Sequence, residues 1–132
     1  MYRYIRYFLF LFKPELAHHI SMKGLKLACF FGFIRNKNTP SKPITIMGLK
    51  FPNRVGLAAG LDKNAEYITS LSKLGFGFIE VGTVTPRSQP GNSKPRSFRL
   101  IEEEGIINRF GFNNVGIDQF IENIKKQSLR AS

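Results

Sequence analysis

The sequence contains a single cysteine, few acidic residues and no long apolar run. One cysteine in 132 residues, Cys29, excludes a disulfide framework and a multi-cysteine metal site, and it is typical of a reducing compartment. The longest apolar runs, residues 7–12 and 28–34, hold six and seven residues, whereas a membrane-spanning helix needs about 20. No small-residue cleavage site follows the first run, which argues against a secretory signal peptide.

The shortage of acidic residues leaves the chain strongly basic, with 20 Lys and Arg against nine Asp and Glu. The basic charge is uneven, because residues 1–50 hold nine basic residues and one acid, Glu15, and the first 33 residues hold six of the 13 Phe. A basic, aromatic segment is typical of a protein that lies on an anionic membrane surface. One alternative is a basic face packed on its own protein. A nucleic-acid binder is the other, but the sequence contains no recognisable binding module.

The first 35 residues predict two short amphipathic helices. Apolar residues follow helical spacing near the start of the chain, at Ile5, Phe8, Leu9 and Phe12. Pro14 suits the first turn of a second helix that extends to about Phe31. Such helices place an aromatic face in lipid without crossing it, so we expect monotopic attachment by residues 1–35. Residues 36–43 form a polar, proline-containing linker.

Residues 44–132 predict an α/β fold. Short apolar runs that alternate with a helical segment indicate a βαβ unit, whose strands are parallel. Turn residues between other apolar runs indicate two hairpins, and Asn113 or Asn114 is suited to cap a final helix. The expected elements are a hairpin at residues 44–51, strands at 55–59 and 76–81 around a helix at 65–74, a hairpin at 98–108 and a helix at 116–127.

The loops that follow the strands are the candidate functional segments, because α/β folds place their chemistry at the carboxyl ends of strands. Residues 59–63 combine a glycine with a lysine suited to an anion, and the alternative is a plain turn with a surface Asp–Lys pair. Residues 82–83 offer a backbone N–H and a hydroxyl. Residues 108–114 group three amides and an arginine around one glycine, and the alternative is an Asn-rich helix cap. His18 and His19 precede no ligand cluster, so no metal site is expected.

These segments together resemble one enzyme family. The matching motifs are GLAAGLDK (56–63), GFGFIEVGTVTP (75–86), QPGN (89–92), PR (95–96), FRL (98–100) and INRFGFNN (107–114). In this order they resemble dihydroorotate dehydrogenase from about residue 1 to residue 126. The basic, aromatic extension favours the quinone-dependent, membrane-associated class.

The resemblance implies an FMN flavoenzyme of de novo pyrimidine (UMP) biosynthesis. Such an enzyme oxidises dihydroorotate to orotate and passes electrons to ubiquinone. It would be peripheral on the cytoplasmic face of a bacterial inner membrane or on the mitochondrial inner membrane. The fold it implies is the N-terminal part of a (β/α)₈ TIM barrel, at residues 44–132, preceded by the two-helix extension.

The resemblance also implies roles for individual residues. The FMN-binding residues would be Ala59, Gly60, Leu61, Asp62, Lys63 and Thr83. The residues that hold dihydroorotate would be Lys63, Asn108, Arg109, Phe110, Gly111 and Phe112. Arg99 and His18 would lie at the quinone pocket, where the helical extension would form an apolar entrance.

The length departs from the family, since a (β/α)₈ barrel takes about 250 residues. The serine that acts as general base, further substrate asparagines, a second lysine and the FMN phosphate loops are expected downstream, so these 132 residues alone are expected to be inactive. Two hypotheses remain. The chain is the N-terminal part of a quinone-dependent dihydroorotate dehydrogenase, or it is a truncated or split remnant, left by a frameshift or premature stop, that at most binds membrane.

Overall fold

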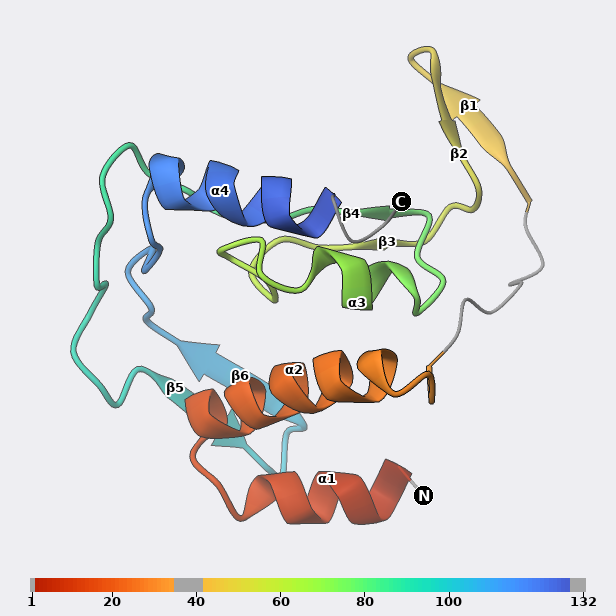
Figure 1. Ribbon diagram of the computed structural model, residues 1–132. Helices are drawn as coiled ribbons and strands as arrows, with labels where there is room; N and C mark the ends of the chain where they lie inside the picture. The colour runs from red at the N-terminus through yellow and green to blue at the C-terminus, as the bar shows by residue number, and fades with distance from the viewer. Residues whose placement is uncertain (1, 35–41, 129–132) are drawn as a thin grey trace.

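Two helices open the chain in the computed structural model, which describes residues 2–34 and 42–128. Helix α1 spans Tyr2–Phe10 and α2 spans Pro14–Phe30, with Pro14 at the first position of α2. Pro14 fits there because the first N–H groups of a helix have no partner within it. The two predicted helices are confirmed, and they contact each other at the start of the chain (Figure 1). Residues 36–41 of the predicted linker at 36–43 lie outside the described residues.

Two antiparallel hairpins occur where the sequence predicts them. Strands β1 (Ile44–Ile46) and β2 (Leu49–Phe51) pair around a turn in which Gly48 has φ +77°. Strands β5 (Ser97–Leu100) and β6 (Gly105–Asn108) pair over four residues each. The second hairpin starts one residue earlier than predicted.

The predicted βαβ unit is present in a shorter form. Strands β3 (Gly56–Leu57) and β4 (Phe78–Ile79) are parallel, with α3 (Ile68–Ser72) between them along the chain. The helix is shorter than the predicted 65–74 because Ala65 has a left-handed φ of +58°. Before it, the Asp62 carboxylate accepts the backbone N–H groups of Glu66 and Tyr67 at 2.9 and 2.8 Å, which fixes a turn in place of a first helical turn.

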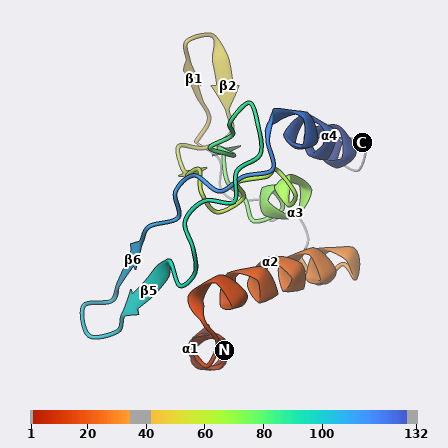
Figure 2. The ribbon, with the colours of Figure 1, turned by 90° about the vertical axis from the view of Figure 1, so that its left-hand side faces the viewer.

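The elements lie in layers that set the place of the site. Helix α2 packs between α1 and α3 and also contacts β5, while α3 contacts β4 and α4 (Ile117–Ser128). The β1–β2 hairpin projects from the end of the molecule opposite α1 (Figure 2). The described strands thus include one parallel pair, and closure into an eight-stranded barrel stays a prediction.

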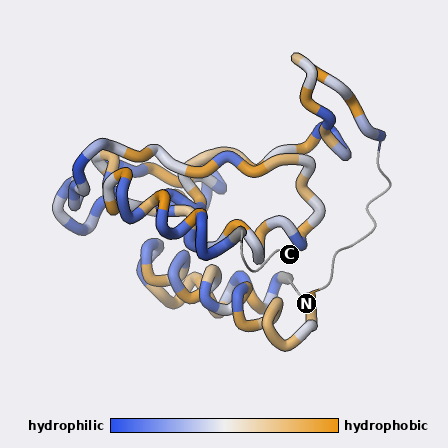
Figure 3. Tube along the Cα trace, turned by 45° about the horizontal axis from the view of Figure 1, so that its top comes forward, coloured by the Kyte–Doolittle hydropathy of each residue, from blue (hydrophilic) through white to orange (hydrophobic). Residues whose placement is uncertain are grey.

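Many large apolar side chains are exposed. On α1 these include Tyr4, Ile5 and Phe8, and Leu11, which directly follows the helix, is 80% exposed. Figure 3 shows hydrophobic stretches along the N-terminal part of the trace. Within residues 2–34 and 42–128, no helix has both the length and the apolar character that crossing a bilayer requires.

Replacement of Leu71 by alanine should lower the free energy of unfolding by about 2–5 kcal/mol. Leu71 lies in α3 with 1% of its surface exposed, so its loss would leave a cavity in the core around α3. Urea unfolding followed by circular dichroism measures the change. Leu74→Ala is the matched control, because Leu74 is 43% exposed and its loss opens no cavity. Equal losses in both variants would contradict this account of the core.

Candidate functional site

A cavity of about 550 Å³ lies beside the carboxyl ends of β3 and β4. It gathers three segments that are far apart in the sequence, namely the loop after β3, the loop after β4 and the segment after β6. Its lining residues are Ala59, Gly60, Lys63, Gly82, Thr83, Asn108, Arg109, Phe110, Gly111 and Phe112. Nine of the residues predicted from the sequence to hold cofactor or substrate therefore share one cavity, which we call the loop cavity.

Gly60 gives the loop cavity an open backbone wall. Its φ is +102°, a region that disfavours side chains with a Cβ, and its N–H donates to the carbonyl of Gly82 at 3.0 Å. A Cβ added at Gly60 would meet no heavy atom within 4 Å. The space beside this peptide is therefore free for a flat ligand to approach the backbone closely.

Lys63 is held in a fixed place at the loop cavity. Its ammonium nitrogen donates to the Asn113 side-chain oxygen at 2.8 Å and lies 4.0 Å from the centre of the Phe110 ring. Burial lowers the pKa of Lys63, the positive charge of Arg96 lowers it further, and the negative charge of Glu15 opposes both. The site thus presents a cation whose position is set by an amide and an aromatic ring.

The segment after β6 is fastened by a buried asparagine. Asn114 is 7% exposed, and its side-chain oxygen accepts the N–H of Gly116 at 2.9 Å while its amide donates to the Phe112 carbonyl at 2.7 Å. These bonds fix the turn before α4. The side chains of Asn108 and Phe112 remain exposed, and both line the loop cavity.

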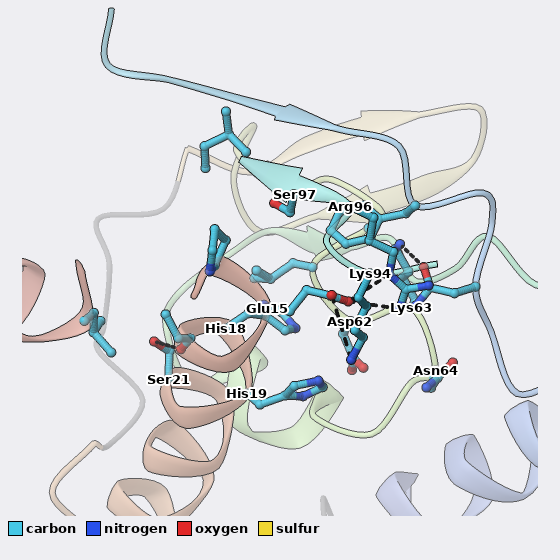
Figure 4. A pocket seen from close by; sticks show the side chains of 18 of the residues that line it. Glu15, His18, His19, Ser21, Asp62, Lys63, Asn64, Lys94, Arg96 and Ser97 are labelled. Carbon is cyan, nitrogen blue, oxygen red and sulfur yellow. Dashed lines mark hydrogen bonds and ion pairs between the residues drawn. The ribbon is translucent and has the colours of Figure 1, made fainter. Parts of the chain in front are cut away.

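A second cavity of about 440 Å³ lies between the N-terminal helices and the rest of the chain (Figure 4). We call it the helix cavity. Its lining includes the remaining predicted site residues, which are His18, Leu61, Asp62 and Arg99. Gly60, Lys63 and Phe110 line both cavities, so the two spaces share a wall. Burial lowers the pKa of His18, and its neighbour His19 lowers it further.

Arg99 connects the helix cavity to α1. Its guanidinium donates to the Phe12 carbonyl at 2.8 Å and to the Leu9 carbonyl at 3.4 Å, and it lies 4.5 Å from the centre of the Phe10 ring. Leu9 lies in the last turn of α1 and Phe12 just after the helix, at the end where the helix dipole favours a cation. Arg99 therefore fixes this end of α1 against β5.

Comparison with known proteins identifies the family. The family model described as dihydroorotate dehydrogenase matches residues 42–131. The chain belongs to the dihydroorotate dehydrogenase family. It is 55% identical over 130 residues to the dihydroorotate dehydrogenase (quinone) of Acinetobacter baylyi, an alignment that covers 98% of this chain and 39% of that protein.

Other members of the dihydroorotate dehydrogenase family agree. The chain is 56% identical over 129 residues to the dihydroorotate dehydrogenase (quinone) of Neisseria meningitidis serogroup C, with 98% of this chain and 38% of that protein covered. It spans about two fifths of the length of these relatives. Crystal structures of the Eimeria tenella dihydroorotate dehydrogenase with ferulenol and without ligand match with TM-scores of 0.74 and 0.73, each at 46% identity. They cover 87% of this chain and 30% and 32% of the Eimeria tenella chains.

The sequence did not predict one ion pair near the site, that between Glu15 and Arg96. The Arg96 guanidinium, 8% exposed, lies 2.9 Å from the Glu15 carboxylate of α2. The available signal was that Glu15 is the single acid among the first 50 residues. Its partner was not predictable because 80 residues separate the two. In the described part of the chain, no three His, Cys, Asp or Glu side chains are arranged to hold a metal ion.

Proposed function

We propose that this chain forms the flavin-facing N-terminal part of a quinone-dependent dihydroorotate dehydrogenase. The whole protein would oxidise dihydroorotate to orotate, with FMN as cofactor and ubiquinone as acceptor, in pyrimidine biosynthesis. The observation that carries this proposal is the loop cavity, where an open glycine wall, a fixed lysine and exposed amide and aromatic side chains from three loops meet.

The loop cavity fits FMN. A flat isoalloxazine ring needs backbone without side chains, which Gly60 provides, and polar groups at its edge, which Lys63 and Thr83 provide. FMN, when bound, supplies the acceptor for the electrons of dihydroorotate. The role of Asp62 in FMN binding would be indirect. Its carboxylate accepts hydrogen bonds from the backbone N–H groups of Glu66 and Tyr67, and these bonds set the shape of the loop.

Dihydroorotate would bind in the same cavity. Its carboxylate matches the Lys63 ammonium, and the alternating carbonyl and N–H groups of its ring match an amide that both donates and accepts, such as Asn108. Arg109, Phe110, Gly111 and Phe112 would form the rest of the wall. Lys63 would also stabilise negative charge that develops during the reaction, because its ammonium is already held in position by Asn113.

The helix cavity would admit the quinone. It lies between the helices α1 and α2 and the shared wall at Gly60, Lys63 and Phe110, so a quinone there would be next to the flavin. Arg99 and His18 line it and would offer hydrogen-bond donors to quinone oxygens. The relatives from Acinetobacter baylyi and Neisseria meningitidis are named dihydroorotate dehydrogenase (quinone), which supports this assignment.

Residues 1–35 would form the membrane-associated extension, followed by the linker at 36–43 and the barrel part at 44–132. Exposed apolar side chains on α1, with Arg3 and Arg6 on the same helix, suit an anionic lipid surface. The protein would then be peripheral on a bacterial inner membrane or the mitochondrial inner membrane.

The double variant Phe8→Ser/Leu11→Ser should weaken binding of the chain to anionic vesicles by at least about tenfold, because two apolar side chains would no longer enter lipid. Co-sedimentation with vesicles that contain phosphatidylglycerol measures the binding. Met47→Ser/Leu49→Ser is the matched control, since these residues are 92% and 63% exposed but lie at the end of the molecule opposite α1. Equal binding by both double variants would refute lipid contact by Phe8 and Leu11.

A chimera tests the proposed function. In it, this chain replaces the aligned 130 residues of the Acinetobacter baylyi relative, so that the rest of the barrel is supplied. We expect the chimera to reduce a soluble ubiquinone analogue when dihydroorotate is added. A folded chimera without this activity would favour the alternative, in which the chain is a remnant without catalytic function.

A further inference from the structure

The pair Glu15 and Arg96 occupies the point where the N-terminal helices meet the shared wall of the two cavities. Glu15 lies in the first turn of α2, and Arg96 immediately precedes β5. Two guanidinium nitrogens of Arg96 contact one Glu15 oxygen, at 3.0 and 2.9 Å. The pair is largely buried, with 8% of the Arg96 side chain and 19% of the Glu15 side chain exposed, so solvent screens it little.

Arg96 also holds the loop before β5 and the segment after β6 in place. Its third guanidinium nitrogen donates to the carbonyls of Pro90 and Asn92 at 2.6 and 3.1 Å, and its own carbonyl accepts the N–H of Arg109 at 2.9 Å. The guanidinium lies 5.6 Å from the centre of the Phe110 ring, over which the Lys63 ammonium lies at 4.0 Å. One ring therefore contacts two cations, and one of them is tied to α2.

We propose that Arg96 is a positioning residue that, through Glu15, couples the seating of α2 to the place of Lys63 beside Phe110. A shift of α2 moves the Glu15 carboxylate and thereby reorients the Arg96 guanidinium. Because that guanidinium lies against the Phe110 ring, its movement changes both the positive charge near the Lys63 ammonium and the position of the ring beside it. The meaning of this coupling for electron transfer rests on the proposed function of Lys63. The coupling itself concerns only residues of this chain.

Charged and titratable groups from several segments line the two cavities beside Lys63 (Figure 4). They are Glu15, His18 and His19 of α2, Asp62 and Glu66 between β3 and α3, Lys94 and Arg96 before β5, Arg99 in β5 and Arg109 after β6. Of these, Arg96 lowers the pKa of Lys63 and Glu15 raises it. Neutralising each in turn therefore shifts the titration of Lys63 in opposite directions. A loss of packing would act differently, because greater exposure raises a lysine pKa in either variant.

The test is the pH dependence of Lys63 acetylation by acetic anhydride in the full 132-residue chain, measured by mass spectrometry, since only the neutral amine reacts. We expect Glu15→Gln to move the midpoint to lower pH and Arg96→Gln to move it to higher pH, each by about half a pH unit or more. Lys94→Gln is the matched control, because Lys94 lies 3.8 Å from Glu15 but its side chain is 65% exposed. It should leave the midpoint unchanged.

Three outcomes would overturn the proposal. They are no shift in Glu15→Gln, a shift to higher pH in Glu15→Gln, or an equal shift in Lys94→Gln. Glu15→Gln keeps the size of the side chain and a hydrogen-bond acceptor, so it decides the question even if Arg96→Gln does not fold. The measurement uses neither flavin nor dihydroorotate, so its result is independent of whether the chimera is active.

Discussion

Lys63→Ala in the chimera is expected to lower kcat/KM for dihydroorotate by about 10²–10³-fold, the usual cost of removing one preorganised electrostatic contact from an active site. The Lys63 ammonium is held by Asn113 at 2.8 Å and by the Phe110 ring, so it is in position before any ligand binds. Its loss removes the ammonium group that lines both the loop cavity and the helix cavity. Steady-state kinetics with dihydroorotate and a soluble quinone measure the effect.

The control for Lys63→Ala is Lys50→Ala. Lys50 lies in β2, is exposed and lines neither cavity. Its removal lowers the net charge by the same amount but should leave kcat/KM unchanged. A loss below threefold in Lys63→Ala, or similar losses in both variants, would show that Lys63 does not face the reacting groups.

Gly60→Val in the chimera is expected to weaken FMN binding by about tenfold to a hundredfold, because the new side chain would occupy the space where the flavin ring meets the backbone. The positive φ of +102° adds backbone strain, since β-branched residues are disfavoured there. Equilibrium dialysis against free FMN gives the dissociation constant.

The control variant Gly48→Val separates the effect of backbone strain from the effect of blocking the flavin site. Gly48 also has a positive φ, +77°, and a Cβ there would likewise meet no heavy atom within 4 Å, but it lies in the turn between β1 and β2. The control should lose stability and keep its affinity for FMN. Undiminished FMN binding by Gly60→Val would place the flavin elsewhere.

The sequence predicted the elements whose signals are local. The apolar runs around Gly48, the parallel pair β3–β4 and the helix that starts at Pro14 all follow from neighbouring residues, and the structure confirms them. That Gly60 and Thr83 lie together was also predictable, because the loops at the carboxyl ends of parallel strands meet at one edge of the sheet. Asn108 ends the antiparallel strand β6, so its place beside them was implied by the family resemblance alone.

Contacts between distant segments were not predictable. Nothing near Arg96 in the sequence indicates that it pairs with Glu15, and nothing near Arg99 indicates that it binds the end of α1. The short α3 was missed for another reason. Alanine favours helices, but Ala65 is fully buried in a left-handed conformation beside the turn that Asp62 holds, so tertiary packing overrides its helix preference.

The most direct test of the central claim is whether dihydroorotate reduces flavin that is bound at the loop cavity. The chimera, loaded with FMN and kept free of oxygen and quinone, is mixed with dihydroorotate while its visible absorbance is recorded. We predict that the flavin absorbance bleaches and that it returns when a quinone is added. A chimera that retains FMN but shows no bleaching with dihydroorotate would contradict the assignment of Gly60, Lys63 and Asn108 to one flavin and substrate site.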